Sequence, residues 1–190
     1  SLSADYAAYA EAYTGAGTFN VAAASVAVNV AYAETGTIVN VGLIGGTLRY
    51  VGSADLALSA DGSGKAYAGV RAAVVSLSGV QIAANVVIAK LTAEQNVFII
   101  DTDLTTSGNV SILSTYNKNS TSAKSTPCGA VAAITSPDLS ATLYGLQINS
   151  ATAITDAKVR AFTRASSITA NQLTIKASGK SIAVPTYTLG

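Results

Sequence analysis

One phrase occurs three times along the chain, and this recurrence limits the possible folds more than any other feature. Residues 52–60 are GSADLALSA, residues 107–115 are SGNVSILST and residues 170–177 are ANQLTIKA. In each copy, residues that favour turns precede an alternation of apolar and small polar side chains. This alternation has the period of a β-strand with one buried face. The phrase therefore predicts the same turn and strand at three places.

The spacing of the copies indicates a long structural repeat. Counted along the chain, the spacings between Leu56, Val110 and Leu173 are 110 − 56 = 54 and 173 − 110 = 63. A second phrase, LSAD, occurs at residues 2–5 and again at residues 58–61, and its spacing is 58 − 2 = 56. Regular recurrence of a unit this long is typical of proteins whose repeats stack on one another.

Composition favours one sheet-rich domain over residues 1–190. Apolar residues make up 49% of the chain and charged residues 11%, against about 25% charged residues in an ordinary soluble domain. Intrinsic disorder requires the opposite balance. The net charge of +1 gives no argument for a nucleic-acid partner. The apolar run at residues 21–33 contains Ser25 and Asn29 and is too short to cross a bilayer, so we expect no membrane insertion.

Three imperfect units are expected, at about residues 17–69, 70–128 and 129–190. Each begins with an Ala/Val-rich strand, continues with a strand rich in Thr or Ile, turns at Gly or Asn, and ends with a strand of the V-x-I or L-x-L type. One unit has too few large side chains to bury a core alone, whereas stacked units can share one. The abundant alanine predicts small inward side chains where two faces approach closely.

Local details of this pattern are less well determined by the sequence. The run DGSG at residues 61–64 is expected to be a loop, and the additional length of the third unit is expected near residues 137–145. Tyr6, Tyr9 and Tyr13 follow spacings of three and four residues, which also fit one face of a helix.

The fold predicted from these observations is all-β, most simply a parallel β-solenoid of about three imperfect repeats. The alternative is a β-sandwich body of a self-assembling fibre or surface-lattice subunit. In that arrangement an Ala/Val-rich strand such as residues 21–32 completes the sheet of a neighbouring subunit by β-augmentation. Composition supports both, because each needs many strands, few charges and paired edges.

The order of these segments resembles the long repeats of large bacterial surface proteins of the leukotoxin-like or filamentous-haemagglutinin-like adhesin type. Such repeats have a Gly/Ala/Val-rich stretch, a middle segment and a G-x-V-x-V-x-A strand. Residues 108–112 and 55–60 match the last strand, residues 96–100 match the middle segment loosely, and the long glycine runs of those repeats are missing here. The resemblance implies a β-helical stalk or adhesive segment at the cell surface and no catalytic residues.

Candidate catalytic and metal-binding residues are few. The chain has no histidine, and its single cysteine, Cys128, excludes an internal disulfide and a cysteine-based zinc site. Asp101 and Asp103 carry oxygen ligands suited to Ca²⁺, but neither the glycine nor the bidentate glutamate of a calcium loop follows them. Together with Asp138 and Asp156 they are also the candidate carboxylates of a glycan-cleaving enzyme. Turn aspartates are the better interpretation, so we predict no catalytic site, no metal and no cofactor.

Asn109 and Asn119 each begin a glycosylation sequon, NVS and NST respectively. Asn119 lies in a predicted loop and is the better candidate for modification. We expect an extracellular or cell-surface protein with a structural or adhesive role. The expected partners are neighbouring repeats or subunits, or a host or cell-surface glycan or protein. The alternative role is a filament or surface-lattice subunit joined to its neighbours by strand donation.

Overall fold

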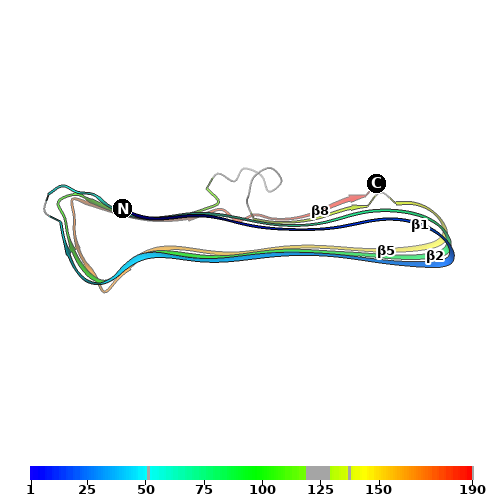
Figure 1. The fold of residues 1–190 in the computed structure, drawn as a ribbon, viewed down its shortest axis with the longest axis horizontal. Helices are drawn as coiled ribbons and strands as arrows, with labels where there is room; N and C mark the ends of the chain where they lie inside the picture. Colours follow the sequence, from blue (N-terminus) through cyan, green and yellow to red (C-terminus); the bar gives the residue numbers. More distant parts are fainter. Residues whose placement is uncertain (51, 119–128, 137, 190) are drawn as a thin grey trace.

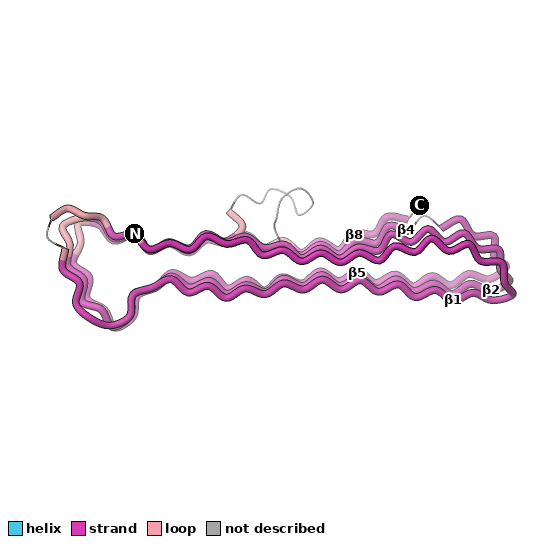
Figure 2. The backbone as a smooth tube through the Cα atoms, in the orientation of Figure 1, coloured by secondary structure: helices cyan, strands magenta, loops and turns pink. Residues whose placement is uncertain are grey.

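The protein is all-β, as its sequence predicts. A computed structural model describes residues 1–50, 52–118, 129–136 and 138–189, and within them the regular structure is entirely β-strand (Figure 2). The strands are β1 (Leu2–Arg49), β2 (Leu56–Thr105), β3 (Asn109–Tyr116), β4 (Gly129–Ser136), β5 (Asp138–Arg164), β6 (Ser167–Thr169), β7 (Gln172–Gly179) and β8 (Ala183–Leu189).

The chain winds in long, flat passes that form two layers (Figure 1). The first part of β1, up to about residue 14, runs along the upper layer of Figure 1; the chain then turns a corner, and residues 24–44 return along the lower layer. Strand β2 repeats this course. Strands β3, β4, β7 and β8 continue the upper layer, and β5 continues the lower one. Each pass is therefore one long loop, and successive passes lie side by side.

All pairings between the described strands are parallel, and the offset in residue number is constant along each pair. Between β1 and β2 this offset is 58 − 2 = 56, from Leu2 opposite Leu58 to Arg49 opposite Thr105. The recurring phrase is in register as predicted, because Val110 lies opposite Leu56 on one side and opposite Leu173 on the other. The copies of the recurring phrase therefore occupy equivalent positions in neighbouring strands.

The additional length of the third pass lies elsewhere than predicted. Between β2 and its next partner the offset is 116 − 62 = 54 at Gly62 and Tyr116, but 129 − 65 = 64 at Lys65 and Gly129. It keeps the larger value along β5. The additional residues therefore fall between Tyr116 and Gly129, and the expectation of residues 137–145 is wrong. Asn117, with φ of 53°, leaves the extended conformation where this insertion begins.

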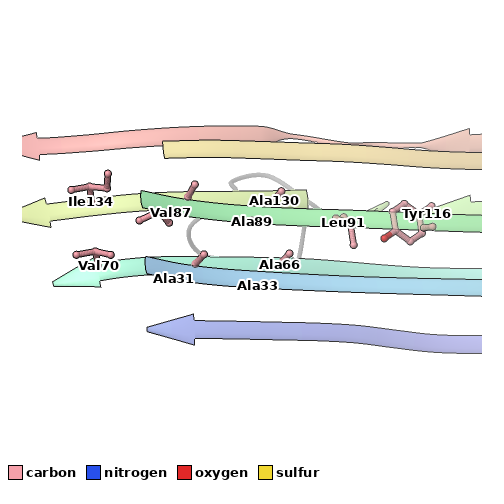
Figure 3. Close-up of a cluster of buried hydrophobic side chains, with 13 residues drawn as sticks. Ala31, Ala33, Ala66, Val70, Val87, Ala89, Leu91, Tyr116, Ala130 and Ile134 are labelled. Atoms are coloured by element: carbon pink, nitrogen blue, oxygen red, sulfur yellow. The ribbon is translucent and has the colours of Figure 1, made fainter. Parts of the chain in front are cut away.

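Alanines fill much of the space between the two layers in one buried cluster, as predicted, whereas larger side chains make up most of a second cluster. Along β2 the side chains alternate between buried and partly exposed positions. Figure 3 shows one cluster of buried side chains, in which alanines from several strands surround a few larger residues. The alanines of this cluster that are at most 5% exposed are Ala31, Ala33, Ala66, Ala68, Ala89, Ala93, Ala130 and Ala132.

Residues 61–64 are part of β2 rather than a loop, which corrects the prediction. Gly62 and Gly64 point inward, and a Cβ atom on either would overlap a tyrosine ring, that of Tyr6 at Gly62 and that of Tyr116 at Gly64. The glycines therefore make room for two interior aromatic side chains. The helical alternative for the N-terminal tyrosines is also wrong, because those residues belong to β1.

Each pass bends at an equivalent point after the lower layer. Gly45 has φ of 70°, Asp101 of 50° and Ala165 of 47°. These positions correspond in register, since 101 − 45 = 56 and 165 − 101 = 64 are the offsets of the flanking strands. The left-handed conformation favours glycine, yet two of the three positions carry a side chain. The left-handed conformation at this point is therefore imposed by the pairing with neighbouring passes and not by the residue type alone.

Candidate functional site

The outer face of the lower layer carries large apolar side chains that are open to solvent. In β1 the Ala/Val-rich residues 26–32 alternate between large and small side chains, and the large ones point away from the interior. Val26 is 71% exposed, Val28 66% and Val30 55%. The inward positions between them are held by Ala27, Asn29 and other small residues.

These side chains form rows that cross the three lower strands. Val26, Ile82 and Leu146 occupy one row, because Val26 pairs with Ile82 and Ile82 with Leu146. Neighbouring rows add further apolar residues, and all members are at least 39% exposed. We call this surface the outer apolar face; it comprises Val26, Val28, Val30, Tyr32, Val80, Ile82, Tyr144, Leu146 and Ile148.

The size of the outer apolar face can be estimated from strand geometry. The nine residues of the face, about 6.6 Å apart along a strand and about 4.8 Å between strands, cover roughly 290 Å². The largest apolar patch of an ordinary monomer covers about 300–600 Å² and is often functional. The face is therefore close in size to the largest apolar patch of an ordinary monomer, and it is flat and uncharged.

A charged region adjoins this face further along the same strands. Lys90 and Glu34 form an ion pair of 2.7 Å, and Arg160 and Glu94 form one of 2.9 Å. The hydrogen bond from Lys90 is the main cause that lowers the pKa of Glu34. Exposed pairs of this kind contribute little to stability. A shallow hollow of about 500 Å³ lies beside them, over Gly36 and Thr92.

A second exposed cluster lies on the outer face of the upper layer. The Nζ of Lys65 is 5.6 Å from the ring centroid of Tyr9 and 5.7 Å from that of Tyr67, and Arg71 lies over Tyr13 at 5.7 Å. Hydrogen bonds from Tyr13 and Tyr9 lower the pKa of the Glu11 carboxyl, which lies between them. Exposed cation–π contacts of this type contribute about 0.5–1 kcal/mol each.

Several polar side chains are buried between the layers that the sequence pattern did not predict, and Gln95 is the most deeply buried of them. Gln95 is fully buried in the lower layer and reaches across to the upper layer. Its amide group donates to the carbonyl oxygen of Ala60 at 2.7 Å, to the hydroxyl of Ser114 at 3.1 Å and to the carbonyl oxygen of Thr115 at 3.2 Å. The hydroxyl of Tyr6 donates to its Oε1 at 3.2 Å. Gln95 therefore connects the two layers.

A row of asparagines crosses the lower layer on its inward side. The Nδ2 of Asn29 donates to Oδ1 of Asn85 at 2.9 Å, and the Nδ2 of Asn85 donates to Oδ1 of Asn149 at 2.8 Å. We call this row the asparagine ladder. Its signal in the sequence is an asparagine recurring at the repeat offset, since 85 − 29 = 56 and 149 − 85 = 64.

The structure does not assemble the candidate carboxylates into a site. Asp101 and Asp103 are exposed at the bend after the lower layer, whereas Asp156 lies within β5, 3.9 Å from Lys158. The side chain of Asp138 is outside the described part. Among the described residues, no three acidic, histidine or cysteine side chains are grouped so that they would hold a metal ion. The turn interpretation of Asp101 is consistent with its position.

The two sequons differ in what the structure describes. Asn109 begins β3, where its backbone N–H donates to Oδ1 of Asp55 at 2.7 Å and its side-chain oxygen accepts from Asn171 at 3.0 Å. Asn119 lies outside the described residues, as does Cys128. Modification of either asparagine stays a prediction.

Over the part of the chain that the structure describes, no helix is long and apolar enough to cross a membrane. The resemblance to bacterial adhesin repeats also stays a prediction. Comparisons with protein-family models, with curated proteins and with solved structures gave no match to this chain.

Proposed function

We propose that this chain is a structural and adhesive segment of an extracellular protein, built as a parallel β-solenoid without catalytic activity. The parallel passes in constant register support the solenoid, since each pass obtains its buried surface from its neighbours. The low content of charged residues supports an extended, sheet-rich stalk. The chain has no histidine, and its described carboxylates are dispersed, which argues for a structural role.

The observation that carries the adhesive part of this proposal is the outer apolar face. Apolar side chains that are 39–75% exposed in adjoining rows cost solvation free energy in a free monomer. A flat sheet face on a stiff scaffold suits contact with another extended surface, such as a second protein or the apolar faces of a glycan. The tyrosines and cations of the upper layer offer a second contact surface of different chemistry.

Adhesion can be tested with the full chain attached to beads. We expect the beads to resist detachment by flow from an octyl-coated surface. The variant Val26→Thr/Ile82→Thr/Leu146→Thr removes one row of the outer apolar face. Threonine is β-branched and favours strands, so the sheet should be preserved. Most beads that carry this variant are expected to detach from the octyl-coated surface under the same flow. The matched control Ser59→Thr/Thr115→Val changes the opposite layer. Equal retention by the triple variant and the control would contradict the adhesive role.

A second candidate function is a filament subunit joined by strand donation. The specific observation that favours it is the unpaired outer edge of β1, a strand of 48 residues that pairs only with β2 among the described strands. Long open edges readily accept another strand. Electron micrographs of the purified chain would show regular filaments in this case, and single short rods if the chain is a stalk segment alone.

A further inference from the structure

Two tyrosines from neighbouring passes meet on the outer face of the upper layer. The ring centroids of Tyr13, in β1, and Tyr67, in β2, are 5.1 Å apart, and the ring planes are inclined by 45°. Tyr13 lies opposite Gly69 in the register of the two strands. Tyr67 lies opposite Glu11, in the next outward row, so the two rings are diagonal neighbours. Because Tyr13 is 51% exposed and Tyr67 is partly exposed, the pair is open to reagents in solvent.

Gly69 allows the reactive carbons of the two rings to approach each other. A Cβ atom on Gly69 would lie 3.0 Å from Cε1 of Tyr13 and 3.0 Å from Cε1 of Tyr67, so the two Cε1 atoms are at most 6.0 Å apart (3.0 + 3.0). The Cε atoms adjoin the carbon that bears the hydroxyl group, and they are the positions at which phenoxyl radicals couple. Tyr67 also packs against Val131, which limits its freedom to turn away from Tyr13.

The Glu11 carboxylate is placed to accept a phenol proton. It accepts a hydrogen bond from the hydroxyl of Tyr13. The Cζ of Arg71 lies over the same ring, 5.7 Å from its centroid. A cation beside the ring opposes the loss of an electron alone, because a second positive charge would form next to the first. Oxidation of Tyr13 is therefore favoured when its proton passes to Glu11 in the same step.

The composition of the chain directs oxidation to tyrosine. The chain has nine tyrosines and one cysteine, Cys128, and it has no methionine, tryptophan or histidine. A second pair of tyrosines in ring contact within the described part, Tyr6 and Tyr116, has centroids 6.5 Å apart. Tyr116 is buried, and the hydroxyl of Tyr6 donates to the Gln95 amide rather than to a carboxylate. This interior pair is therefore a natural control for the outer one.

We propose that Tyr13 and Tyr67 are a site of oxidative cross-linking, at which a one-electron oxidant such as a haem peroxidase with hydrogen peroxide joins the passes of β1 and β2 through a dityrosine bond. Each phenol loses one electron and one proton to give a neutral phenoxyl radical, and Glu11 receives the proton of Tyr13. The two radicals form a carbon–carbon bond between their Cε atoms, and the hydrogen on each bonded carbon moves to the phenol oxygen. The two electrons and two protons reduce one hydrogen peroxide to two water molecules.

The bond would fasten one pass covalently to the next. It closes a loop of 67 − 13 = 54 residues, and a cross-link over a loop of this length stabilises a protein mainly by restricting its unfolded chain. The linked chain should therefore unfold at a temperature higher by roughly 5–10 °C. This inference goes beyond the adhesive function and does not depend on it, because the pair lies on the layer opposite the outer apolar face.

The test is oxidation of the full chain, in a Cys128→Ser background, by a haem peroxidase and hydrogen peroxide at low protein concentration. The monomer is then denatured, digested with trypsin and analysed by mass spectrometry. Trypsin releases Tyr13 in residues 1–49 and Tyr67 in residues 66–71. We expect these two peptides to be joined with the loss of two hydrogen atoms, and fragmentation of the product to place the bond on Tyr13.

The interior pair supplies the matched comparison in the same digest. A bond between Tyr6 and Tyr116 would join residues 1–49 to residues 91–118 instead. This product should be much rarer than the product that contains residues 66–71. Oxidation in concentrated urea should abolish the difference, because the unfolded chain no longer holds either pair together.

Three variants assign the roles within the pair. Tyr67→Phe keeps the ring but lacks the phenol, and it should abolish the bond. Tyr9→Phe, on the same outer face, should leave the bond in place. Glu11→Gln keeps a hydrogen-bond acceptor but is not a base at neutral pH, so it should slow formation of the bond by about tenfold or more. Prolonged oxidation of Glu11→Gln should still give the same product.

Several results would overturn the proposal. Absence of the joined peptides from the monomer, or equal yields at the outer and interior pairs of the folded chain, would refute the site. A bond that persists in Tyr67→Phe or disappears in Tyr9→Phe would assign the cross-link to other residues. An unchanged rate in Glu11→Gln would refute the proton transfer to Glu11.

Discussion

Strands β3 and β7 carry the same phrase and differ almost completely in burial. Val110 and Ile112 of β3 are fully buried, whereas Leu173 and Ile175, in the same rows of β7, are 44% and 42% exposed. β3 has a strand on each side, β2 and β7, whereas β7 pairs only with β3 among the described strands. A pass therefore buries its inward side chains only where strands of neighbouring passes cover them. Stability should therefore depend on a residue's place in the stack more than on its identity.

The largest effect is expected for truncation inside the covered pass. Ile112→Ala removes a fully buried side chain from the row formed by Leu58, Ile112 and Ile175, and should lower the free energy of unfolding by about 3–4 kcal/mol. The matched variant Ile175→Ala should lower it by about 1 kcal/mol, because that side chain is already partly solvated. Urea unfolding measures both. Equal losses for the two variants would contradict the comparison.

The next effect concerns the connection between the layers. Gln95→Leu leaves the carbonyl oxygen of Ala60 and the hydroxyl of Tyr6 without their buried partner. The free energy of unfolding should fall by about 1–3 kcal/mol, measured by urea unfolding. Gln172→Leu, at an exposed position of β7, is the control and should change little. If Gln95→Leu left the free energy of unfolding unchanged, the hydrogen bonds of Gln95 would not stabilise the contact between the two layers.

A smaller effect should appear at alkaline pH. Burial raises the pKa of the Tyr116 phenol, and burial also raises that of Tyr6. The unfolded chain loses these protons near pH 10 while the folded chain retains them, so the stability present below pH 10 falls as the pH rises. The free energy of unfolding should fall by about 1 kcal/mol between pH 10 and 11 for Tyr116. Tyr116→Phe should reduce this slope in urea unfolding, and an unchanged slope would refute the assignment.

The smallest effect is expected at the bend, which all three passes share. Ala165→Gly should raise the free energy of unfolding by up to about 1 kcal/mol, because φ of 47° is unfavourable for alanine. The control Ala161→Gly, in the extended part of β5, should lower it by about 0.5–1 kcal/mol. Thermal unfolding compares the two. A loss of stability in Ala165→Gly would show that the bend has no strain to release.

The register could be predicted from the sequence because whole phrases recur. Leu2 lies opposite Leu58 and Leu56 opposite Val110, which are the pairs that the recurring phrases align. Strand content also followed from the two-residue period. Both the register and the strand content can be predicted from one sequence, because each depends on a local pattern or on a repeated phrase.

The direction of the alternation in the lower layer could not be predicted. In residues 26–32 both alternating sets are largely apolar, valine on one side and alanine with Asn29 on the other. Hydropathy favours burying valine, but the narrow space between the layers admits alanine and the asparagine ladder instead. The hydrogen-bond partners of Gln95 could not be predicted either, because they come from three strands of the opposite layer.

The parallel stacking of successive passes is tested most directly by disulfide cross-linking at two distant rows. In a Cys128→Ser background, Val26→Cys/Ile82→Cys and Asn40→Cys/Asn96→Cys join neighbours at opposite ends of the lower layer. Cα atoms of paired strands are about 5 Å apart, within disulfide range. We expect efficient oxidation of both pairs if the strands are parallel and in this register. An antiparallel sheet that paired residues 26 and 82 would instead place Asn40 opposite residue 68 (26 + 82 − 40). Cross-linking of only one of the two pairs would therefore contradict the parallel stacking.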